Sequence, residues 1–348
     1  MIQPQNSGWN IAFTEKVDLA NEKVGGVAIS TNDDFFAPKE NLIKASTPIF
    51  ITDKYTEFGK WMDGWESRRK RNLVPESHDW CIVKLGLPGA IHGVDVDTAF
   101  FTGNYPEYCS IEATHAADNA SAESLGAAKW TEILSKSKLQ GGSHNLFTIL
   151  TRERFTHVRL KIFPDGGVAR LRIYGEVLPD PKKLSSSTPI DLAALENGGV
   201  VITCNDSFFS AKENLILPGR AQHMGEGWET RRKRGPGHDW IIINLGTPGT
   251  LSKIEVDTHH YKGNFPESCS IDATFIPGSR LLPVDFREGR TIEWTEILPR
   301  TKLQADMKHT FEKEIKTDSQ KTKFNYVRLN IYPDGGISRL RVYGVPSA

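Results

Sequence analysis

Apolar and polar residues alternate along much of the chain, and this period of two predicts short β-strands. In IHGVDVDT, residues 91–98, the valines fall on one face while Asp95 and Asp97 fall on the other. Residues 155–163 (FTHVRLKIF) and 168–175 (VARLRIYG) alternate in the same way. Helical signals are few, and turns rich in Gly and Pro separate the strands. The pattern predicts an all-β fold built from β-sandwiches, and it leaves jelly-roll and immunoglobulin-like topologies open.

The pattern occurs twice along the chain, which predicts a duplicated domain rather than a solenoid of short units. GWESRRKR at 64–71 recurs as GWETRRKR at 227–234. GNYPEYCSIEAT is answered by GNFPESCSIDAT, and FPDGGVARLRIYG by YPDGGISRLRVYG, in the same order. The segment between the copies is rich in Pro, Ser and Lys, as linkers often are. We predict a first repeat at 1–177, a linker at 178–189 and a second repeat at 190–348.

Composition limits the possible partners of this chain. The 348 residues carry 43 Lys and Arg against 43 Asp and Glu, so the formal net charge is zero. Nucleic-acid-binding proteins usually show a basic excess, so we expect no nucleic-acid partner despite the RRKR run. No apolar run approaches the roughly 20 residues that span a bilayer, and the start does not resemble a signal peptide. Four cysteines without a CxxC pair favour free thiols. We expect a cytoplasmic protein without a membrane partner that forms a homo-oligomer.

Both copies also keep polar residues in predicted loops, where sequences usually drift. The paired candidates for substrate binding are Asp33/Asp206, Asn41/Asn214, Glu66/Glu229, Arg68/Arg231, Arg69/Arg232, Asp97/Asp257, Asn104/Asn264 and Arg170/Arg339. The paired candidates for proton transfer are Glu107/Glu267 and His78/His238. Their retention predicts one similar pocket in each repeat, although a single active copy or a site formed between the copies stays open.

Each candidate also has a purely structural interpretation. A histidine beside an aspartate is often held for structural reasons, the PDGG segments are typical tight turns, and a basic run is usually a solvated surface. However, a guanidinium oriented by a carboxylate is ready to bind an anion through two hydrogen bonds. We therefore expect Glu66 to orient Arg68 or Arg69 in a loop that Trp65 anchors. Lys70 and Arg71 receive no role.

Common catalytic signatures are missing. The chain has no GxSxG nucleophile motif, no phosphate-binding loop and no HExxH zinc motif. A divalent metal is possible, but no ligand motif indicates one, and the sequence leaves the cofactor unknown. Carboxylates, histidines, arginines and amides remain, and these suit hydrolysis of a small, anionic, amide-rich molecule.

The motifs NDDFFAPKENL, GWESRRKR, HDW, GNYPE and PDGGVARLRIYG, with their second copies, resemble the allantoicase (allantoate amidinohydrolase) family from about Val17 to Gly344. The resemblance implies two galactose-binding-like jelly-roll domains and the hydrolysis of allantoate to ureidoglycolate and urea in purine degradation. From the chemistry of that substrate, we expect Arg68 or Arg69 to bind its carboxylate. We assign proton transfer to Glu107 and His78, and contacts with the ureido groups to Asp33, Asn41, Asp97 and Asn104.

A non-enzymatic protein that binds a small ligand or carbohydrate is the alternative. Such a site would need exposed aromatic side chains for stacking on sugars. The candidates are Trp61, Trp65, Tyr105 and Trp228.

Overall fold

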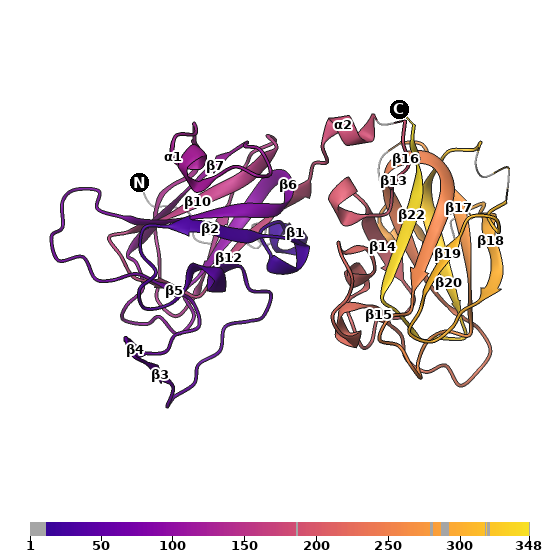
Figure 1. Cartoon of the computed structure of the whole chain (residues 1–348), viewed down its shortest axis with the longest axis horizontal. Helices are drawn as coiled ribbons and strands as arrows, with labels where there is room; N and C mark the ends of the chain where they lie inside the picture. Colours follow the sequence, from indigo (N-terminus) through magenta and orange to yellow (C-terminus); the bar gives the residue numbers. More distant parts are fainter. Residues whose placement is uncertain are drawn as a thin grey trace. The chain divides into compact units, whose positions relative to one another are not determined.

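A computed structural model describes the chain over residues 12–185, 187–278, 281–286, 292–316, 318 and 321–347. The chain divides into two compact units, Met1–Leu178 and Pro179–Ala348 (Figure 1). Each unit is built almost entirely from antiparallel strands. The predicted all-β class with two tandem sandwich domains is confirmed, whereas the predicted limits of the repeats and of the linker stay a prediction.

The elements of the first unit are mostly short. Its strands are β1 (Val17–Asp18), β2 (Val27–Thr31), β3 (Tyr55–Thr56), β4 (Gly59–Lys60), β5 (Trp65–Glu66), β6 (Asp79–Asp97), β7 (Tyr108–Thr114), β8 (Thr131–Lys138), β9 (His144–Thr148), β10 (Phe155–Phe163), β11 (Gly167–Val168) and β12 (Arg170–Val177). Its helical turns are η1 (Ala12–Glu15), η2 (Glu22–Val24), η3 (Lys39–Ile43) and α1 (Ala122–Gly126).

The second unit repeats this order. Its strands are β13 (Ile190–Asp191), β14 (Val200–Cys204), β15 (Trp228–Glu229), β16 (Asp239–Asp257), β17 (Ser268–Thr274), β18 (Thr295–Lys302), β19 (Lys308–Phe311), β20 (Phe324–Tyr332), β21 (Gly336–Ile337) and β22 (Arg339–Pro346). Its helical turns are α2 (Pro181–Leu184), η4 (Leu195–Asn197), η5 (Lys212–Ile216), η6 (Met224–Glu226) and η7 (Pro283–Phe286). Over the described residues, no helix has the length and apolar character needed to cross a membrane.

The long strand β6 contributes to both layers of the first sandwich. Its first half pairs with β2 and β10, and its second half pairs with β9 and β12. Cys81 therefore lies opposite Leu160 in one layer, and Val96 lies opposite Leu171 in the other. Because these inward residues are fully buried, the two layers share one apolar core. In the second unit, β16 plays the same part with β14, β20, β19 and β22.

The course of β6 brings both of its ends to one end of the sandwich. Its first residue pairs with the end of β10, and its last residue, Asp97, pairs with Arg170 at the start of β12. The PDGG turn follows β10, and the GNYPE loop leads into β7, whose first residue lies opposite Phe163. The retained loop motifs are therefore neighbours in space although they are distant in sequence.

Short strand pairs complete this end. β5 pairs with β11, so that Glu66 faces Gly167 and Trp65 faces Val168. Trp65 is fully buried, and its indole Nε1 donates a hydrogen bond to the carbonyl oxygen of Asp33 at 2.8 Å. The tryptophan thus anchors the loop that precedes RRKR, as we expected from the sequence. The same contacts recur at Trp228.

Candidate active site

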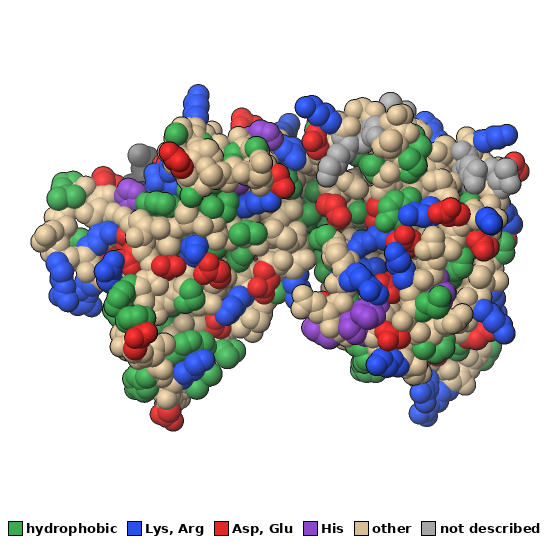
Figure 2. Space-filling model, viewed as in Figure 1, with side chains coloured by type: hydrophobic (Ala, Val, Ile, Leu, Met, Phe, Trp, Pro, Cys, Tyr) green, Lys and Arg blue, Asp and Glu red, His purple; other side chains and the backbone are tan. Residues whose placement is uncertain are grey.

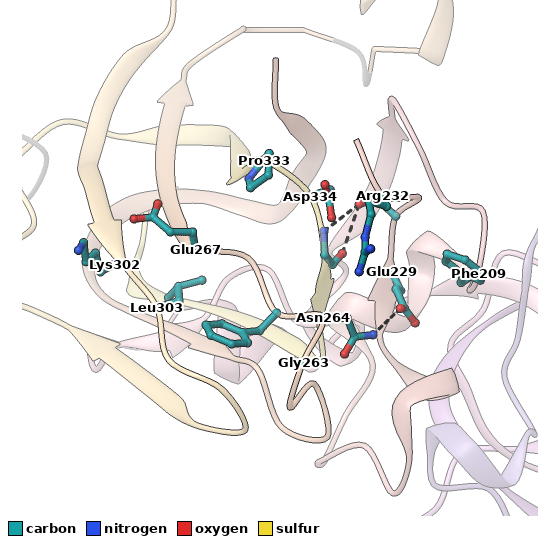
Figure 3. A pocket seen from close by; sticks show the side chains of 13 residues that line it. Phe209, Glu229, Arg232, Gly263, Asn264, Glu267, Lys302, Leu303, Pro333 and Asp334 are labelled. Atoms are coloured by element: carbon teal, nitrogen blue, oxygen red, sulfur yellow. Dashed lines mark hydrogen bonds between the residues drawn. The ribbon is translucent and has the colours of Figure 1, made fainter. Parts of the chain in front are cut away.

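A pocket of about 620 Å³ opens among the loops at this end of the second unit (Figure 3). Its walls come from GWETRRKR, GNFPE and YPDGG, together with the end of β18. Its charged and amide-bearing side chains are Glu229, Arg232, Asn264, Glu267, Lys302 and Asp334. Phe209, Phe265, Leu303 and Pro333 are among its other lining residues. Charges of both signs around an open cavity suit a small polar ligand.

The first unit carries a corresponding pocket of about 830 Å³. The equivalent polar side chains are Glu66, Arg69, Asn104, Glu107 and Asp165. Its lining also includes Arg68, Lys70, Arg71 and Leu73. Each unit therefore assembles a pocket from its own residues, and four of the predicted pairs meet in it: Glu66/Glu229, Arg69/Arg232, Asn104/Asn264 and Glu107/Glu267.

An amide–carboxylate pair lines each pocket. Asn104 Nδ2 donates a hydrogen bond to Glu66 Oε1 at 2.8 Å, and in the second unit Asn264 donates to Glu229 at 2.5 Å (Figure 3). Burial raises the pKa of Glu66, and the bond from Asn104 opposes that rise. The sequence had suggested a guanidinium as the partner of Glu66, but the partner in the structure is this amide.

The carboxylate that orients an arginine is Asp33. Arg68 Nε donates to Asp33 Oδ2 at 2.7 Å, and the Arg68 backbone amide donates to the other oxygen at 3.3 Å. Burial alone would raise the pKa of Asp33, but the hydrogen bonds from Arg68 and from the Phe35 amide outweigh it, so that the pKa is lowered. The guanidinium also lies over the ring of Phe35, 5.1 Å from its centroid. Arg68 is thus already engaged with the protein.

Arg231 makes the same contacts in the second unit. Its Nε donates to Asp206 Oδ2 at 2.8 Å, and its guanidinium lies 5.1 Å from the ring centroid of Phe208. Its neighbour Arg232 and the equivalent Arg69 are exposed and line their pockets. Neither has a hydrogen-bond or ion-pair partner within the described residues. Of the two arginines that the sequence left open, the second of each pair is therefore the one free to bind an anion.

The role of Lys70, which the sequence left open, is visible in the structure. Its backbone amide donates to Asp165 Oδ2 at 2.7 Å, and its ammonium forms an ion pair with the buried Asp79. Lys233 repeats both contacts, with Asp334 at 2.7 Å and with Asp239 at 2.8 Å. The aspartate of the PDGG turn therefore holds the basic loop in place, beyond the turn-forming role that its sequence indicates.

The glycine after that aspartate is required by both conformation and space. Gly166 has φ +135° and Gly335 has φ +136°. A Cβ on Gly335 would lie 2.6 Å from the carbonyl oxygen of Asn264 and 2.8 Å from the nitrogen of Pro266. The turn is thus packed directly against the loop that supplies the pocket amide.

We expect Gly335→Ala to lower the free energy of unfolding of the second unit by about 1–3 kcal/mol, because it adds both backbone strain and a steric clash. Gly235→Ala is the matched control, since Gly235 has open space around its Cα and no positive φ. Denaturant unfolding of both variants would check this prediction. Equal stability of the two variants would contradict it.

The two predicted proton-transfer residues differ in position. Glu107 and Glu267 lie in the lining of their pockets and are exposed. His78 and His238 lie outside that lining: each ring packs on the aromatic residue before the PDGG proline, with centroids 5.3 Å from Phe163 and 4.8 Å from Tyr332. His78 Nδ1 also donates to the carbonyl oxygen of Glu76 at 2.9 Å. The structure brings the glutamates, and not the histidines, to the pocket.

Asn41 and Arg170 lie behind the pocket and are occupied by protein groups. Asn41 Nδ2 donates to the carbonyl oxygen of Gly64 at 2.8 Å. Arg170 is 1% exposed; its guanidinium donates to Asp63 Oδ2 at 2.8 Å and to three backbone carbonyl groups. In the second unit, Asn214 and Arg339 likewise donate to backbone carbonyl groups. These four side chains support the segments that lead into the pocket.

Asp97 lies at a separate hollow of about 520 Å³, together with Asp95 and His144. Its Oδ1 accepts a hydrogen bond from the Ala99 amide at 2.8 Å. Asp257 likewise accepts one from the His259 amide at 3.0 Å and lines a smaller hollow. Both therefore cap the turn that follows the long strand and lie apart from Arg69 or Arg232.

From the sequence we did not identify Lys302 as a pocket residue, and we assigned Asp165 and Asp334 only to a tight turn. The sequence did contain a signal for Lys302, because WTEIL is followed by a Lys–Leu pair in both copies.

Within the described ranges, no group of three or more His, Cys, Asp and Glu residues is arranged to hold a metal ion.

Comparisons with known proteins show which family the chain resembles. Residues 17–178 and 190–347 match the protein-family model described as "Allantoicase repeat". "Probable allantoicase 1" of Burkholderia mallei is 47% identical over 95% of this chain and 95% of its own length. "Allantoicase" of Dictyostelium discoideum is 46% identical over 94% of this chain and 87% of its own length.

A solved structure is similar along nearly the whole chain. The crystal structure of allantoicase from Saccharomyces cerevisiae superimposes with a TM-score of 0.73 and 36% identity, covering 95% of this chain and 93% of that one. The two matched repeats, the shared fold and the identity over nearly the full length agree. This chain belongs to the allantoicase family.

Proposed function

We propose that the protein hydrolyses allantoate to ureidoglycolate and urea, as an enzyme of purine degradation. Family membership supports this activity and does not favour the alternative of a binding protein without catalysis. The observation that carries the proposal is an arginine in each pocket, Arg69 or Arg232, that has no hydrogen-bond or ion-pair partner among the described residues and lines the pocket together with a half-buried amide–carboxylate pair. That combination matches a substrate with one carboxylate and two ureido arms.

The substrate is oriented by charge and by hydrogen bonds. The guanidinium of Arg69 binds the allantoate carboxylate through two parallel N–H donors. Glu66 and Asn104, already joined to each other, present a carboxylate oxygen and an amide oxygen to the N–H groups of a ureido arm. Asp33 and Asp165 keep the arginine loop in place, as described above. The predicted contacts of Asn41, Asp97, Arg170 and their counterparts with the substrate stay a prediction, and their bonds to protein groups support a positioning role.

The reaction breaks one bond between the central carbon and a ureido nitrogen. The oxygen of water forms the new bond to that carbon, and a proton reaches the departing nitrogen, which leaves as urea. Glu107 lies at the edge of the pocket and can donate that proton or accept one from water. His78 could contribute to this transfer only after its ring turned away from Phe163.

We expect the purified protein to release urea and ureidoglycolate in equal amounts from allantoate. A parallel assay after treatment with a chelator, followed by addition of divalent cations, would show whether a metal takes part. Absence of urea release by the folded protein under both conditions would contradict the proposed function.

We further propose that the protein acts in the cytoplasm and self-associates. The four free cysteines support a reducing compartment. Hydrophobic side chains at the surface near the β3–β4 hairpin, with Tyr55 68% exposed and Ile49 53% exposed, support an interface (Figure 2). Sedimentation should give a mass above that of one chain, and Tyr55→Ser should lower it. A monomer at micromolar concentration would contradict self-association.

A further inference from the structure

The two units differ in the partner of one basic residue, which lies in the strand next to the pocket. Lys136 in β8 and Arg300 in β18 are equivalent, because both follow WTEIL at the same distance. Lys136 Nζ forms an ion pair with Glu76 Oε1 at 3.0 Å. Arg300 instead binds Glu267, with Nη2 3.1 Å from its Oε2. The cation thus turns away from the pocket glutamate in the first unit and toward it in the second.

The cause lies in the loop between the basic run and HDW. The first repeat has NLVPES at 72–77, whereas the second has only GPG at 235–237. Glu76, which attracts Lys136, belongs to the longer loop, and the shorter loop offers no carboxylate. The residue after the pocket glutamate changes as well, from Tyr108 to Ser268.

These changes leave the two pocket glutamates in different states. Glu267 accepts hydrogen bonds from Ser268 Oγ at 2.5 Å and from Arg300, which both lower its pKa, with the serine bond the larger cause. The side chain of Glu107 has no hydrogen-bond or ion-pair partner in the part of the chain that the structure describes. A carboxylate held by a cation is a poorer proton acceptor than a free one, because its protonated form loses these interactions.

The cations that line the two pockets also differ. Lys302, from the end of β18, lines the second pocket together with Arg232, whereas the lining of the larger first pocket does not include the equivalent Lys138. The first pocket is lined by Arg68, Arg69, Lys70 and Arg71, of which Arg68 and Lys70 are paired with Asp33 and Asp79. Each pocket therefore offers cations that can hold a carboxylate ligand, and the engagement of the pocket glutamate is what distinguishes the two.

We propose that the two pockets are unequal: the first carries most of the turnover, and the second binds allantoate but hydrolyses it slowly. Glu76 and Arg300 are the positioning residues that set this difference. Glu76 binds Lys136 and so keeps this cation from Glu107, whereas Arg300 binds Glu267 directly. The proposal rests on the proposed function, because it concerns the same reaction at the same residues.

Disabling the pockets one at a time tests the proposal on the full-length chain. We expect Arg69→Ala to lower kcat for urea release at least tenfold, a loss at least five times larger than the loss caused by Arg232→Ala. Calorimetry should still detect one bound allantoate per chain in the Arg69→Ala variant. Equal losses of kcat in the two variants, or no allantoate binding by the Arg69→Ala variant, would overturn the proposal. An inactive wild-type protein would instead contradict the proposed function.

The positioning residues are tested in these single-pocket backgrounds. In the Arg69→Ala protein, Arg300→Met should raise kcat at least threefold. It should also shift the acidic limb of the pH profile to higher pH, because a group that lowers the pKa of Glu267 is removed. In the Arg232→Ala protein, Glu76→Gln should lower kcat at least threefold, and Glu76→Asp should restore it.

Glu153→Gln is the control for a lost exposed carboxylate and should leave kcat unchanged, because Glu153 lies outside both pockets. Unchanged kcat and unchanged pH profiles in the Arg300 and Glu76 variants would overturn their positioning role.

Discussion

Arg69→Ala combined with Arg232→Ala is expected to reduce urea release from allantoate at least about a hundredfold. Removing one partner of a hydrogen-bonded charge pair typically costs about 2–5 kcal/mol, and a factor of ten corresponds to roughly 1.4 kcal/mol. These two guanidinium groups line the pockets and have no partner among the described residues, whereas the preceding arginine in each copy already binds Asp33 or Asp206. The double variant therefore loses the proposed carboxylate contact in both pockets.

Arg234→Ala provides the matched control. Arg234 belongs to the same basic run as Arg232, but it does not line the second pocket. We expect its loss to change kcat/KM less than twofold. If Arg234→Ala reduced kcat/KM as much as the Arg69→Ala, Arg232→Ala double variant did, general charge attraction rather than a specific contact would account for substrate binding.

Arg170→Ala is expected to destabilise the first unit by about 3–5 kcal/mol, because it removes the hydrogen-bonded cation of a buried carboxylate and leaves only Lys44, 3.8 Å away. Arg170 and Asp63 are 1% and 7% exposed and are joined at 2.8 Å. Burial alone would raise the pKa of Asp63, and the hydrogen bonds from Arg170 and from the Ile49 amide outweigh this effect and lower it. Among the groups that stabilise the charged form of Asp63, the guanidinium is the largest contributor.

Denaturant unfolding followed by tryptophan fluorescence would measure this effect. Arg152→Ala is the control, because Arg152 is exposed and should change the free energy of unfolding by less than about 0.5 kcal/mol. A comparable small change for Arg170→Ala would show that the buried pair contributes little to the stability of the first unit.

Much of the architecture could be predicted from the sequence because duplication and alternation are both local signals. The period of two in IHGVDVDT and FTHVRLKIF reports strands with one face in the core, and it does so in both copies. The course of the long strand β6 was not predictable in this way. A strand that changes layer has the same alternating sequence as two separate strands, and only its partners distinguish them.

The residues that line the pocket could be predicted in part for the same reason. Retained polar residues pointed to Glu66, Arg69, Asn104 and Glu107, which do meet. The choice of partners was not predictable, because Asp33 and Arg68 are separated by 35 positions and meet only once the loops are folded. Retention also cannot distinguish a side chain that binds substrate from one that holds the loop, and Arg170 is the clearest example.

The most direct test of this assignment is a crystal structure of the Glu107→Gln, Glu267→Gln double variant with allantoate. We expect the substrate carboxylate at about 3 Å from the guanidinium nitrogens of Arg69, with a ureido arm against Glu66 and Asn104, and the same arrangement at Arg232. Allantoate bound beside Asp97, or bound with its carboxylate away from both arginines, would contradict the assignment.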